Sequence, residues 1–375
     1  MAKEAKEKNE GFDPGVPVAE AHTPPSAWYT DPDFLEKEKA AVFLRTWQAV
    51  GRTDQVRKKG DFFTGTLLGE PYLVVCEEPG RLRAFSNVCR HHAAPVARGE
   101  GRLERLVCPY HGWTYNLSGR LTRAPRMAGV KHFDRERFSL PELQVTTWGP
   151  LVLVIFDRTA KPSSEGLEEL EGRLEESGTF HLPFAARRTF ELACNWKVFV
   201  ENYLDGGYHV AGLHPGLAAQ LDLASYRTEV GERFVIQSCR AGGRGAAPRM
   251  EEAEAGDFQE RVGGGALYAW IHPNLMLNRY GPILDTNRVF PLAPGRCRVV
   301  FDWFVAPEAT AGDARFLERS LRASEKVQEE DTWICAAVQE GLASGSYDRG
   351  RYAPALEHGM HHFHRLLARD LQGNP

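Results

Sequence analysis

The sequence lacks long apolar stretches, and none approaches the ~20 consecutive apolar residues that a membrane-spanning helix needs. It also lacks a charge bias, because 46 Lys and Arg stand against 50 Asp and Glu, a formal net charge of −4. Binding to nucleic acid or to an anionic membrane is therefore not expected. The first ten residues contain no Arg and no apolar core, unlike a secretory signal or a transit peptide. We expect a cytoplasmic globular protein that binds neither nucleic acid nor a membrane.

A disulfide framework is also not expected, because the seven cysteines are odd in number and widely spaced. Reduced thiols then serve as small buried side chains or as metal ligands. Two of the seven, Cys89 and Cys108, have a histidine two or three residues further on. The other five lie in apolar or strand-like surroundings and are expected in the core: Cys76, Cys194, Cys239, Cys297 and Cys335.

The length of 375 residues predicts two domains. We expect a disordered tail over residues 1–21, followed by a helical segment over 22–45 that packs on the catalytic domain. Short β-type runs bounded by Gly, Pro or Asn predict an all-β domain over 46–157. From residue 158 to 375, strands alternate with helical stretches, the longest being Ala314–Leu342. This pattern predicts an α+β domain with an antiparallel sheet and helices on one side.

Two Cys/His pairs stand in the predicted all-β domain, Cys89-Arg-His91 and Cys108-Pro-Tyr-His111, with 16 residues between them. Two cysteines and two histidines could bind structural zinc. The spacing favours another site, because each loop offers one thiolate and one imidazole. In a Rieske [2Fe–2S] cluster, one iron takes both cysteines and the other takes both histidines. The pattern therefore predicts such a cluster, which accepts electrons from a ferredoxin-type donor.

A second candidate metal site begins with His209 and His214. Residues five apart point ~140° apart on an ideal helix, too far round to share an ion. Gly212 and Pro215 allow the helix to end and His214 to turn back towards His209. For either histidine alone, a hydrogen-bonded core position is the alternative.

Asp331 is the candidate third ligand. It lies at helical spacing on the same apolar stripe as Val327, Ile334 and Val338, where an unpaired carboxylate is costly. Two histidines and one carboxylate form the facial triad of non-haem Fe(II) oxygenases. The alternative is a salt bridge from Asp331 to Lys326 or to an arginine. Asp205, one turn before His209, could accept the imidazole N–H and link two redox centres electrically.

Taken together, these motifs resemble the Rieske ring-hydroxylating oxygenase α-subunit family, and within it the choline monooxygenase branch. The likeness extends from residue 23 to near 370. It is carried by the cluster motif and by five further blocks: Thr23–Pro32, Asp61–Gly65, Asn202–Val210, Asn278–Pro282 with Asp285–Asn287, and Met360–His364.

The resemblance implies a Rieske domain ahead of a helix-grip catalytic domain. It also implies a homotrimer in which one subunit's cluster feeds its neighbour's iron, with electrons coming from ferredoxin and a reductase. The implied reaction is hydroxylation of choline to betaine aldehyde hydrate with O₂. His209, His214 and Asp331 correspond to the iron ligands, and Asn202 to a catalytic residue. Many relatives place the bridging acid three residues before the first histidine, where this chain has Gly206.

Aromatic side chains in the catalytic half could form a cage for a quaternary ammonium cation. The candidates are Tyr203, Tyr208, Tyr280 and Trp270, with core packing as the alternative. Another substrate, such as glycine betaine, carnitine or an aromatic acid, stays open, as does a pure electron carrier. A carrier would need neither the second metal site nor about 200 further residues. Four histidines near the C-terminus look like a metal cluster, but a structural role is expected for His358, His361, His362 and His364.

Overall fold

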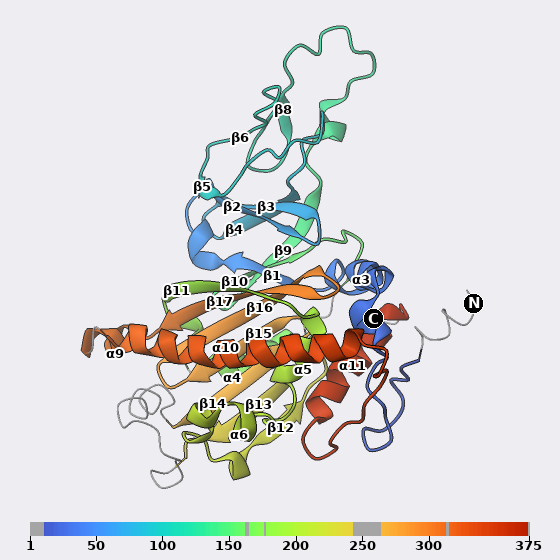
Figure 1. Cartoon of the computed structure of the whole chain (residues 1–375). Helices are drawn as coiled ribbons and strands as arrows, with labels where there is room; N and C mark the ends of the chain where they lie inside the picture. Colours follow the sequence, from blue (N-terminus) through green and yellow to red (C-terminus); the bar gives the residue numbers. More distant parts are fainter. Residues whose placement is uncertain (1–10, 162–164, 176–177, 243–263, 313–314, 374–375) are drawn as a thin grey trace. The chain divides into compact units, whose positions relative to one another are not determined.

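The computed structural model describes residues 11–161, 165–175, 178–242, 264–312 and 315–373. The chain divides into two compact units, which are described separately below (Figure 1). The smaller unit comprises residues 44–162, and the larger one comprises residues 1–43 and 163–375.

The smaller unit is built from antiparallel strands. Its main sheet has seven strands in the order β1 (Gln48–Arg52), β10 (Leu151–Ile155), β9 (Glu142–Trp148), β4 (Arg81–Ser86), β3 (Glu70–Glu78), β2 (Asp61–Leu67) and β5 (Glu100–Arg102). A second sheet has three short strands, β6 (Leu106–Val107), β7 (Thr114–Tyr115) and β8 (Leu121–Arg123). Trp113 and Tyr115 are buried in a core that also takes in Cys89 and Cys108. The two aromatic side chains thus pack in the same core as the cysteines of the two Cys/His loops.

The larger unit contains one seven-stranded antiparallel sheet. Its order is β11 (Phe184–Leu192), β17 (Arg296–Val305), β16 (Ile283–Ala293), β15 (Leu275–Tyr280), β14 (Gly265–Ile271), β13 (Phe234–Arg240) and β12 (Arg227–Val230). From β12 to β17, each strand pairs with the next along the chain, so register is set by local connections. The predicted fold class, an all-β domain with an α+β domain, is confirmed.

Helices contact this sheet and one another. The longest is α10 (Phe316–Ala343), which crosses the sheet of its own unit in Figure 1 and packs against α5 (Trp196–Tyr203). Asn195 caps α5, because its side chain accepts a hydrogen bond from the backbone N–H of Lys197. The other α-helices within the described residues are α2 (Ala27–Thr30), α3 (Pro32–Glu38), α4 (Glu165–Glu175), α6 (Val210–Leu213), α7 (Pro215–Ala218), α9 (Pro307–Gly312) and α11 (His358–Leu371).

The N-terminal segment packs on the rest of the larger unit. Glu38 and Lys197 form an ion pair at 2.8 Å, and both side chains are fully buried. Burial raises the pKa of Glu38, with the Lys197 ammonium opposing the shift. Losing either partner would leave an unpaired buried charge, which costs about 3–5 kcal/mol. This pair therefore ties α3 to α5.

The expectation of a disordered tail over residues 1–21 is wrong for residues 11–21. Phe12 is 5% exposed, and its ring lies against Trp28, His361 and His364. Phe12 anchors this segment, because a buried aromatic side chain removes a large apolar surface from water. Residues 1–10 lie outside the described part of the chain.

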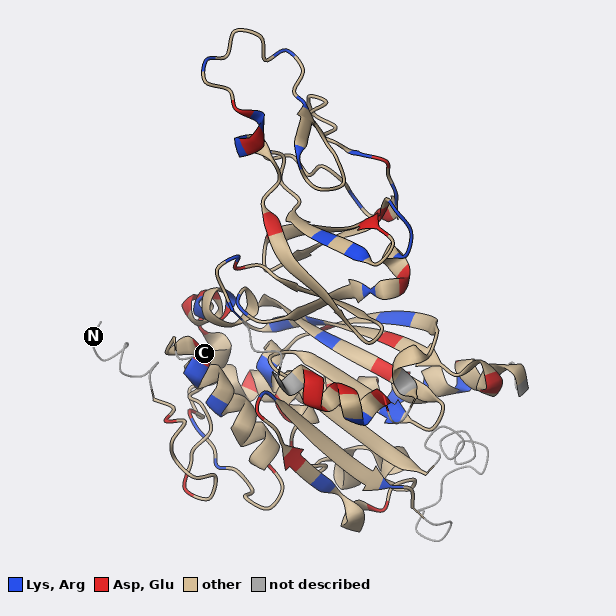
Figure 2. Ribbon diagram, turned by 180° about the vertical axis from the view of Figure 1, so that it is seen from behind, with Lys and Arg blue, Asp and Glu red and all other residues tan. Residues whose placement is uncertain are grey.

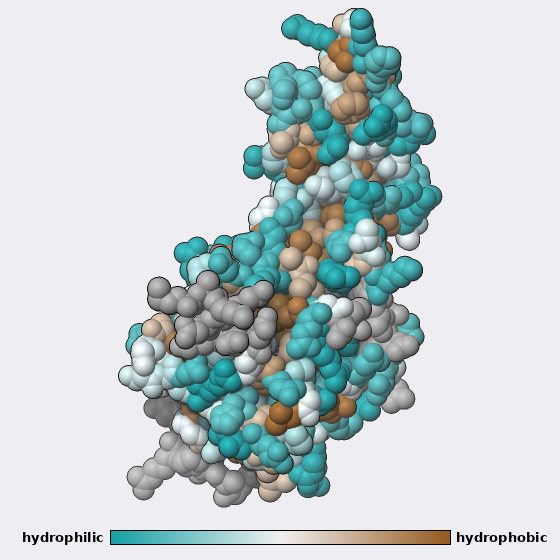
Figure 3. Space-filling model, turned by 90° about the vertical axis from the view of Figure 1, so that its right-hand side faces the viewer, coloured by the Kyte–Doolittle hydropathy of each residue, from teal (hydrophilic) through white to brown (hydrophobic). Residues whose placement is uncertain are grey.

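The surface is ordinary for a globular protein. On the face shown in Figure 3, apolar atoms are interspersed among hydrophilic ones. Among the residues described, no helix combines the length and the apolar character that crossing a bilayer requires.

Candidate metal centres

The two Cys/His loops of the smaller unit bring their ligand atoms together. Nδ1 of His91 lies 3.2 Å from Nδ1 of His111. Each cysteine has a matching backbone turn, in which the residue four positions later donates its N–H to the cysteine carbonyl. The ring of His91 stacks on Trp113 at 4.8 Å between centroids, which fixes its orientation.

Burial and charge at these loops suit a cluster with two different ends. Cys89 and Cys108 are buried, whereas His111 is exposed and His91 half-buried. Partial burial, and then the neighbouring His92 and His111, lower the pKa of His91. A lowered pKa keeps the imidazole neutral, as a metal ligand must be. The donor set therefore fits a cluster with a buried thiolate end and an imidazole end near solvent.

The second centre forms where α5 ends. After Tyr203 the chain turns through Gly206 and Gly207, both with positive φ, and His209 then directly precedes the four-residue helix α6. His214 follows α6 with non-helical backbone angles, and Pro215 starts α7. The helix thus ends before His214, as Gly212 and Pro215 predict. The two imidazole rings lie 5.0 Å apart between centroids.

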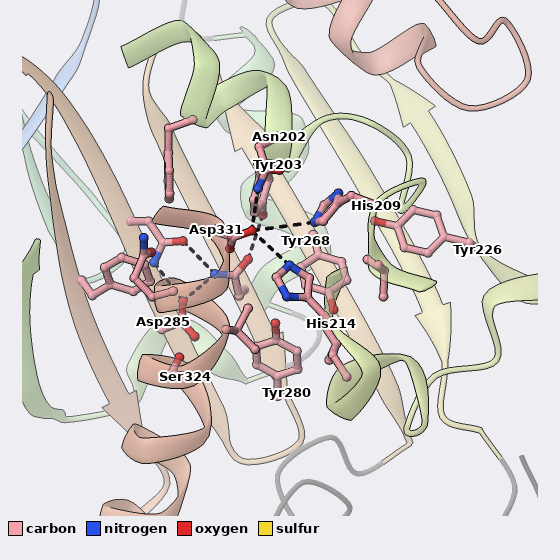
Figure 4. Close-up of a pocket in the computed structure, with 18 residues that line it drawn as sticks. Asn202, Tyr203, His209, His214, Tyr226, Tyr268, Tyr280, Asp285, Ser324 and Asp331 are labelled. Atoms are coloured by element: carbon pink, nitrogen blue, oxygen red, sulfur yellow. Dashed lines mark hydrogen bonds and ion pairs between the residues drawn. The ribbon is translucent and has the colours of Figure 1, made fainter. Parts of the chain in front are cut away.

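Asp331 of α10 faces both histidines (Figure 4). Its Oδ1 lies 3.0 Å from Nε2 of His214 and 4.0 Å from Nε2 of His209. One ligand atom from each of these three residues lies within 4.8 Å of the others. Asn202 of α5 donates from Nδ2 to the same Oδ1 at 2.7 Å. Two imidazole nitrogens and a carboxylate on one side of a pocket are a donor set that fits Fe(II).

Two further carboxylates orient the imidazoles. Oδ2 of Asp205 lies 2.6 Å from Nδ1 of His209, and Oε2 of Glu330 lies 2.6 Å from Nδ1 of His214. Each carboxylate is placed to accept a hydrogen bond from Nδ1, which leaves Nε2 as the nitrogen that can bind a metal. Burial disfavours the charged form of His214, but Asp331 and Glu330 raise its pKa above the ordinary value. A metal cation would take the place of that proton.

The buried face of α10 differs from the predicted stripe. Val338 is 42% exposed, whereas Gln328 and Cys335, on either side of Asp331, are buried. With a period of 3.6 residues, Ser324, Gln328 and Asp331 share one face. This face is polar because it borders a pocket. Hydrophobic periodicity in the sequence therefore could not identify it as the buried face of the helix.

A pocket of about 780 Å³, counting its open mouth, lies beside these ligands. Figure 4 shows Asp331 near its centre, between Asp285 on one side and the two histidines on the other. The described lining residues include two carboxylates, Asp285 and Asp331, and no Lys or Arg. They also include six aromatic side chains: Phe199, Tyr203, Tyr226, Tyr268, Tyr280 and Phe301.

Two of the four predicted cage residues do not line the pocket. Tyr203 and Tyr280 do, but Tyr208 is 61% exposed and Trp270 is fully buried. Trp270 lies two residues beyond Tyr268 on the same strand face, where its ring packs against Phe363 of α11. Tyr208 lies in the turn before His209 and is exposed to solvent.

Sequence reasoning missed three other site residues. Glu330 is one of three adjacent acids, and only the orientation of α10 singles it out. Tyr226 stacks on Tyr268 at 6.4 Å from the chain between α7 and β12. Asp285 belongs to a sequence block that resembles the family, but only the pairing of β16 with β15 shows that it lines the pocket.

The C-terminal histidines take a different part. His364 lies between the Tyr352 hydroxyl at 2.7 Å and the Glu201 carboxylate at 3.0 Å. The Tyr29 hydroxyl also donates to Glu201. The three described residues whose ligand atoms lie within 4.8 Å of one another are His209, His214 and Asp331, and no C-terminal histidine is among them. His364 therefore joins α11 to α5 and α2.

Comparison with known proteins agrees with both centres. Residues 46–134 match the model of the Rieske [2Fe-2S] domain, and residues 181–373 match that of the ring hydroxylating alpha subunit catalytic domain. The chloroplastic choline monooxygenase of Arabidopsis thaliana is 47% identical, over 96% of this chain and 86% of that protein. The carnitine monooxygenase oxygenase subunit of Escherichia coli K12 is 30% identical, over 93% and 94%.

Among solved structures, the quaternary ammonium Rieske monooxygenase CntA superposes with a TM-score of 0.82 at 28% identity. The match covers 97% of this chain and 98% of that one. A cluster site and a mononuclear site are thus found in a chain that matches both parts of this family along most of its length. The chain belongs to the Rieske ring-hydroxylating oxygenase α-subunit family, and it is a non-haem iron monooxygenase with a [2Fe–2S] cluster and a mononuclear iron.

Proposed function

We propose that this enzyme hydroxylates choline to betaine aldehyde hydrate, using O₂ and electrons that a reductase passes through ferredoxin. The main support is the pocket beside His209, His214 and Asp331. It is lined by aromatic rings and carboxylates and, among the described residues, by no Lys or Arg. Such a lining suits a cation with methyl groups. The 47% identity to a plant choline monooxygenase supports the same substrate.

Specific residues are proposed for each metal. Cys89, Cys108, His91 and His111 hold the [2Fe–2S] cluster, and their support is the meeting of the two loops at 3.2 Å. His209, His214 and Asp331 hold the mononuclear iron, supported by the convergence of their ligand atoms. We also propose the domain limits predicted from the sequence, with the Rieske domain over 46–157 and the catalytic domain from 158.

The reaction consumes choline, O₂, two electrons and two protons, and yields betaine aldehyde hydrate and water. When bound, the cluster supplies electrons and the mononuclear iron activates O₂. The protein orients the groups around this chemistry. Asp205 and Glu330 hold protons at Nδ1 of the two histidines, and Asn202 fixes the Asp331 carboxylate. The aromatic lining keeps bulk water from the reacting carbon.

The assembly that we propose is a homotrimer in which the cluster of one subunit serves the iron of the next. Asp205 then serves as the bridging acid, four residues before His209 instead of three. Its support is the 2.6 Å contact with Nδ1 of His209. Exposed His111 and Tyr110 beside the cluster offer a face for this contact. The solved structure of a quaternary ammonium Rieske monooxygenase, 27% identical to this chain, is described as revealing insights into inter-subunit electron transfer. We also propose a cytoplasmic location, as predicted from the sequence.

Iron content and substrate-dependent O₂ uptake test this function. The oxygenase should hold about three irons per chain, whereas an electron carrier would hold two. The Asp331→Ala variant should lose the third iron and all hydroxylation, with an unchanged cluster spectrum. If that variant keeps full activity with an intact cluster, the ligand assignment is wrong.

Choline, glycine betaine, carnitine and benzoate should then be compared with ferredoxin and reductase supplied. O₂ uptake coupled to betaine aldehyde formation is expected with choline. Carnitine is the second candidate, because an Escherichia coli relative is a carnitine monooxygenase. Uptake with carnitine and none with choline would favour that second candidate.

A further inference from the structure

Asp285 is a buried carboxylate that borders the pocket without taking part in the proposed iron site. It lies on β16, is 1% exposed, and pairs across the sheet with Asn278 of β15. Asn278 in turn pairs with Tyr268 of β14. Directly opposed residues of neighbouring strands share a face, so the carboxylate and the aromatic ring both line the pocket.

Two hydrogen bonds from neighbouring asparagine side chains fix the position of the Asp285 carboxylate. Oδ1 of Asp285 accepts from Nδ2 of Asn278 at 2.6 Å and from Nδ2 of Asn287 at 3.1 Å. The Tyr203 hydroxyl lies 2.9 Å from Oδ1 of Asn278 and 2.9 Å from the carbonyl oxygen of Leu277, either of which can accept its proton. Hydrogen bonds donated to a carboxylate favour its ionised form. The pocket wall thus contains a carboxylate held by hydrogen bonds, together with aromatic rings.

We infer that Asp285 is the specificity-determining counter-ion that selects a quaternary ammonium cation with no carboxylate of its own. This inference rests on the proposed choline oxidation and assigns the residue that recognises the cation. Aromatic faces attract a quaternary ammonium group, and a buried carboxylate adds a full charge at low dielectric. A zwitterion such as carnitine or glycine betaine would bring its own carboxylate towards Asp285 and Asp331. Because the described lining offers it no Lys or Arg, the zwitterion is selected against.

The test compares choline with 3,3-dimethyl-1-butanol, which has the same shape but carbon in place of the charged nitrogen. Binding is measured by calorimetry on the iron-loaded enzyme without O₂, and turnover by betaine aldehyde formation. The Asp285→Asn variant keeps the size of the side chain and removes the charge. Asp222→Asn, a half-exposed position outside the pocket lining, is the matched control.

Asp285→Asn should weaken choline binding by about 30-fold or more, since removing one partner of a buried charge pair is costly. Binding of the neutral alcohol should change by less than about threefold, and the control should match wild type. Equal losses for both ligands would mean a structural role and would overturn the inference. An unchanged choline affinity in the variant would overturn it too.

Wild-type enzyme alone keeps the inference testable if the variant does not fold. It should bind choline at least about 30-fold more tightly than the neutral alcohol, and equal affinities would contradict the inference. The two proposals fail separately. Tight, charge-selective binding of choline without betaine aldehyde formation would overturn the proposed reaction and leave the counter-ion role standing. Choline oxidation by an unimpaired Asp285→Asn variant would do the reverse.

Discussion

Each imidazole of the mononuclear site is held at Nδ1 by a carboxylate, Asp205 for His209 and Glu330 for His214. The two carboxylates come from different elements. Asp205 is in the turn after α5, and its Oδ1 also accepts from the backbone of Gly207 and Tyr208. Glu330 is on α10, next to the proposed ligand Asp331. The orientation of His214 therefore depends on the same helix that supplies the carboxylate ligand.

The Glu330→Gln variant should bind the mononuclear iron about 10–100-fold more weakly, the usual cost of losing a partner behind a metal ligand. The neutral amide of Gln accepts a weaker hydrogen bond from Nδ1 than the charged carboxylate does. Nε2 of His214 therefore becomes a poorer electron-pair donor to the iron. Iron titration of the cluster-loaded protein measures this affinity.

Glu329→Gln is the matched control, because Glu329 is the exposed neighbour on the same helix. The cluster spectrum should be unchanged in both variants. An iron affinity in Glu330→Gln equal to that of the control would contradict the role of Glu330.

At the scale of elements, the turn between α5 and α6 positions His209 only because it contains glycine. Gly206 has a φ of +72°, and a Cβ there would lie 2.3 Å from the carbonyl oxygen of Leu356. Its backbone N–H donates to Gln237 of β13, whose amide also donates to the carbonyl of Tyr203. The turn is thus fixed to the sheet at both ends.

Gly206→Ala should destabilise the enzyme by at least about 1–2 kcal/mol, the cost of a left-handed conformation alone. The clash with Leu356 adds to this, and the mononuclear iron should be lost first. Urea unfolding and iron content measure the two effects.

Gly212→Ala provides the control, because a Cβ at Gly212 meets nothing within 4 Å and the residue lies in α6. It should be neutral or slightly stabilising. Equal stability of the two variants would show that the turn does not constrain His209.

The sequence allowed prediction of those features that depend on local spacing. The Cys-x-His and Cys-x-x-His pairs brought four proposed cluster ligands into two loops, and Gly212 with Pro215 signalled the end of α6. The costly carboxylate on an apolar stripe and the need for a third iron ligand pointed to Asp331, and the family resemblance then implied the same residue. The stripe itself was misaligned, because Val338 is exposed. The places of Glu330, Asp285 and Tyr226 depend on helix rotation and strand register, and the contact of Glu330 with His214 spans 116 residues of sequence. No local pattern encodes those contacts.

At the scale of the whole molecule, the net charge of −4 hides an uneven distribution. Residues 44–162 contain 19 Lys and Arg against 11 Asp and Glu, a balance of +8, so the rest of the chain has −12. Figure 2 shows basic segments along the strands and loops of that unit. A positive unit around the cluster is suited to an acidic electron donor.

Reduction of the cluster by an acidic ferredoxin should therefore slow several-fold when salt rises from low to physiological ionic strength. Stopped-flow absorbance of the cluster measures the rate. Replacing the exposed Arg105 and Arg123 with Glu should slow reduction at low salt. The control is Arg322→Glu, an exposed position on α10. A salt-independent rate would contradict electrostatic docking at this unit.

A single turnover tests the central claim most directly. Fully reduced enzyme stores one electron in the cluster and one in Fe(II), enough to hydroxylate one choline without ferredoxin or reductase. Mixed with choline and O₂, it should yield close to one betaine aldehyde per mononuclear iron, together with oxidation of the cluster. Oxidation of the cluster with no product from choline would contradict the account.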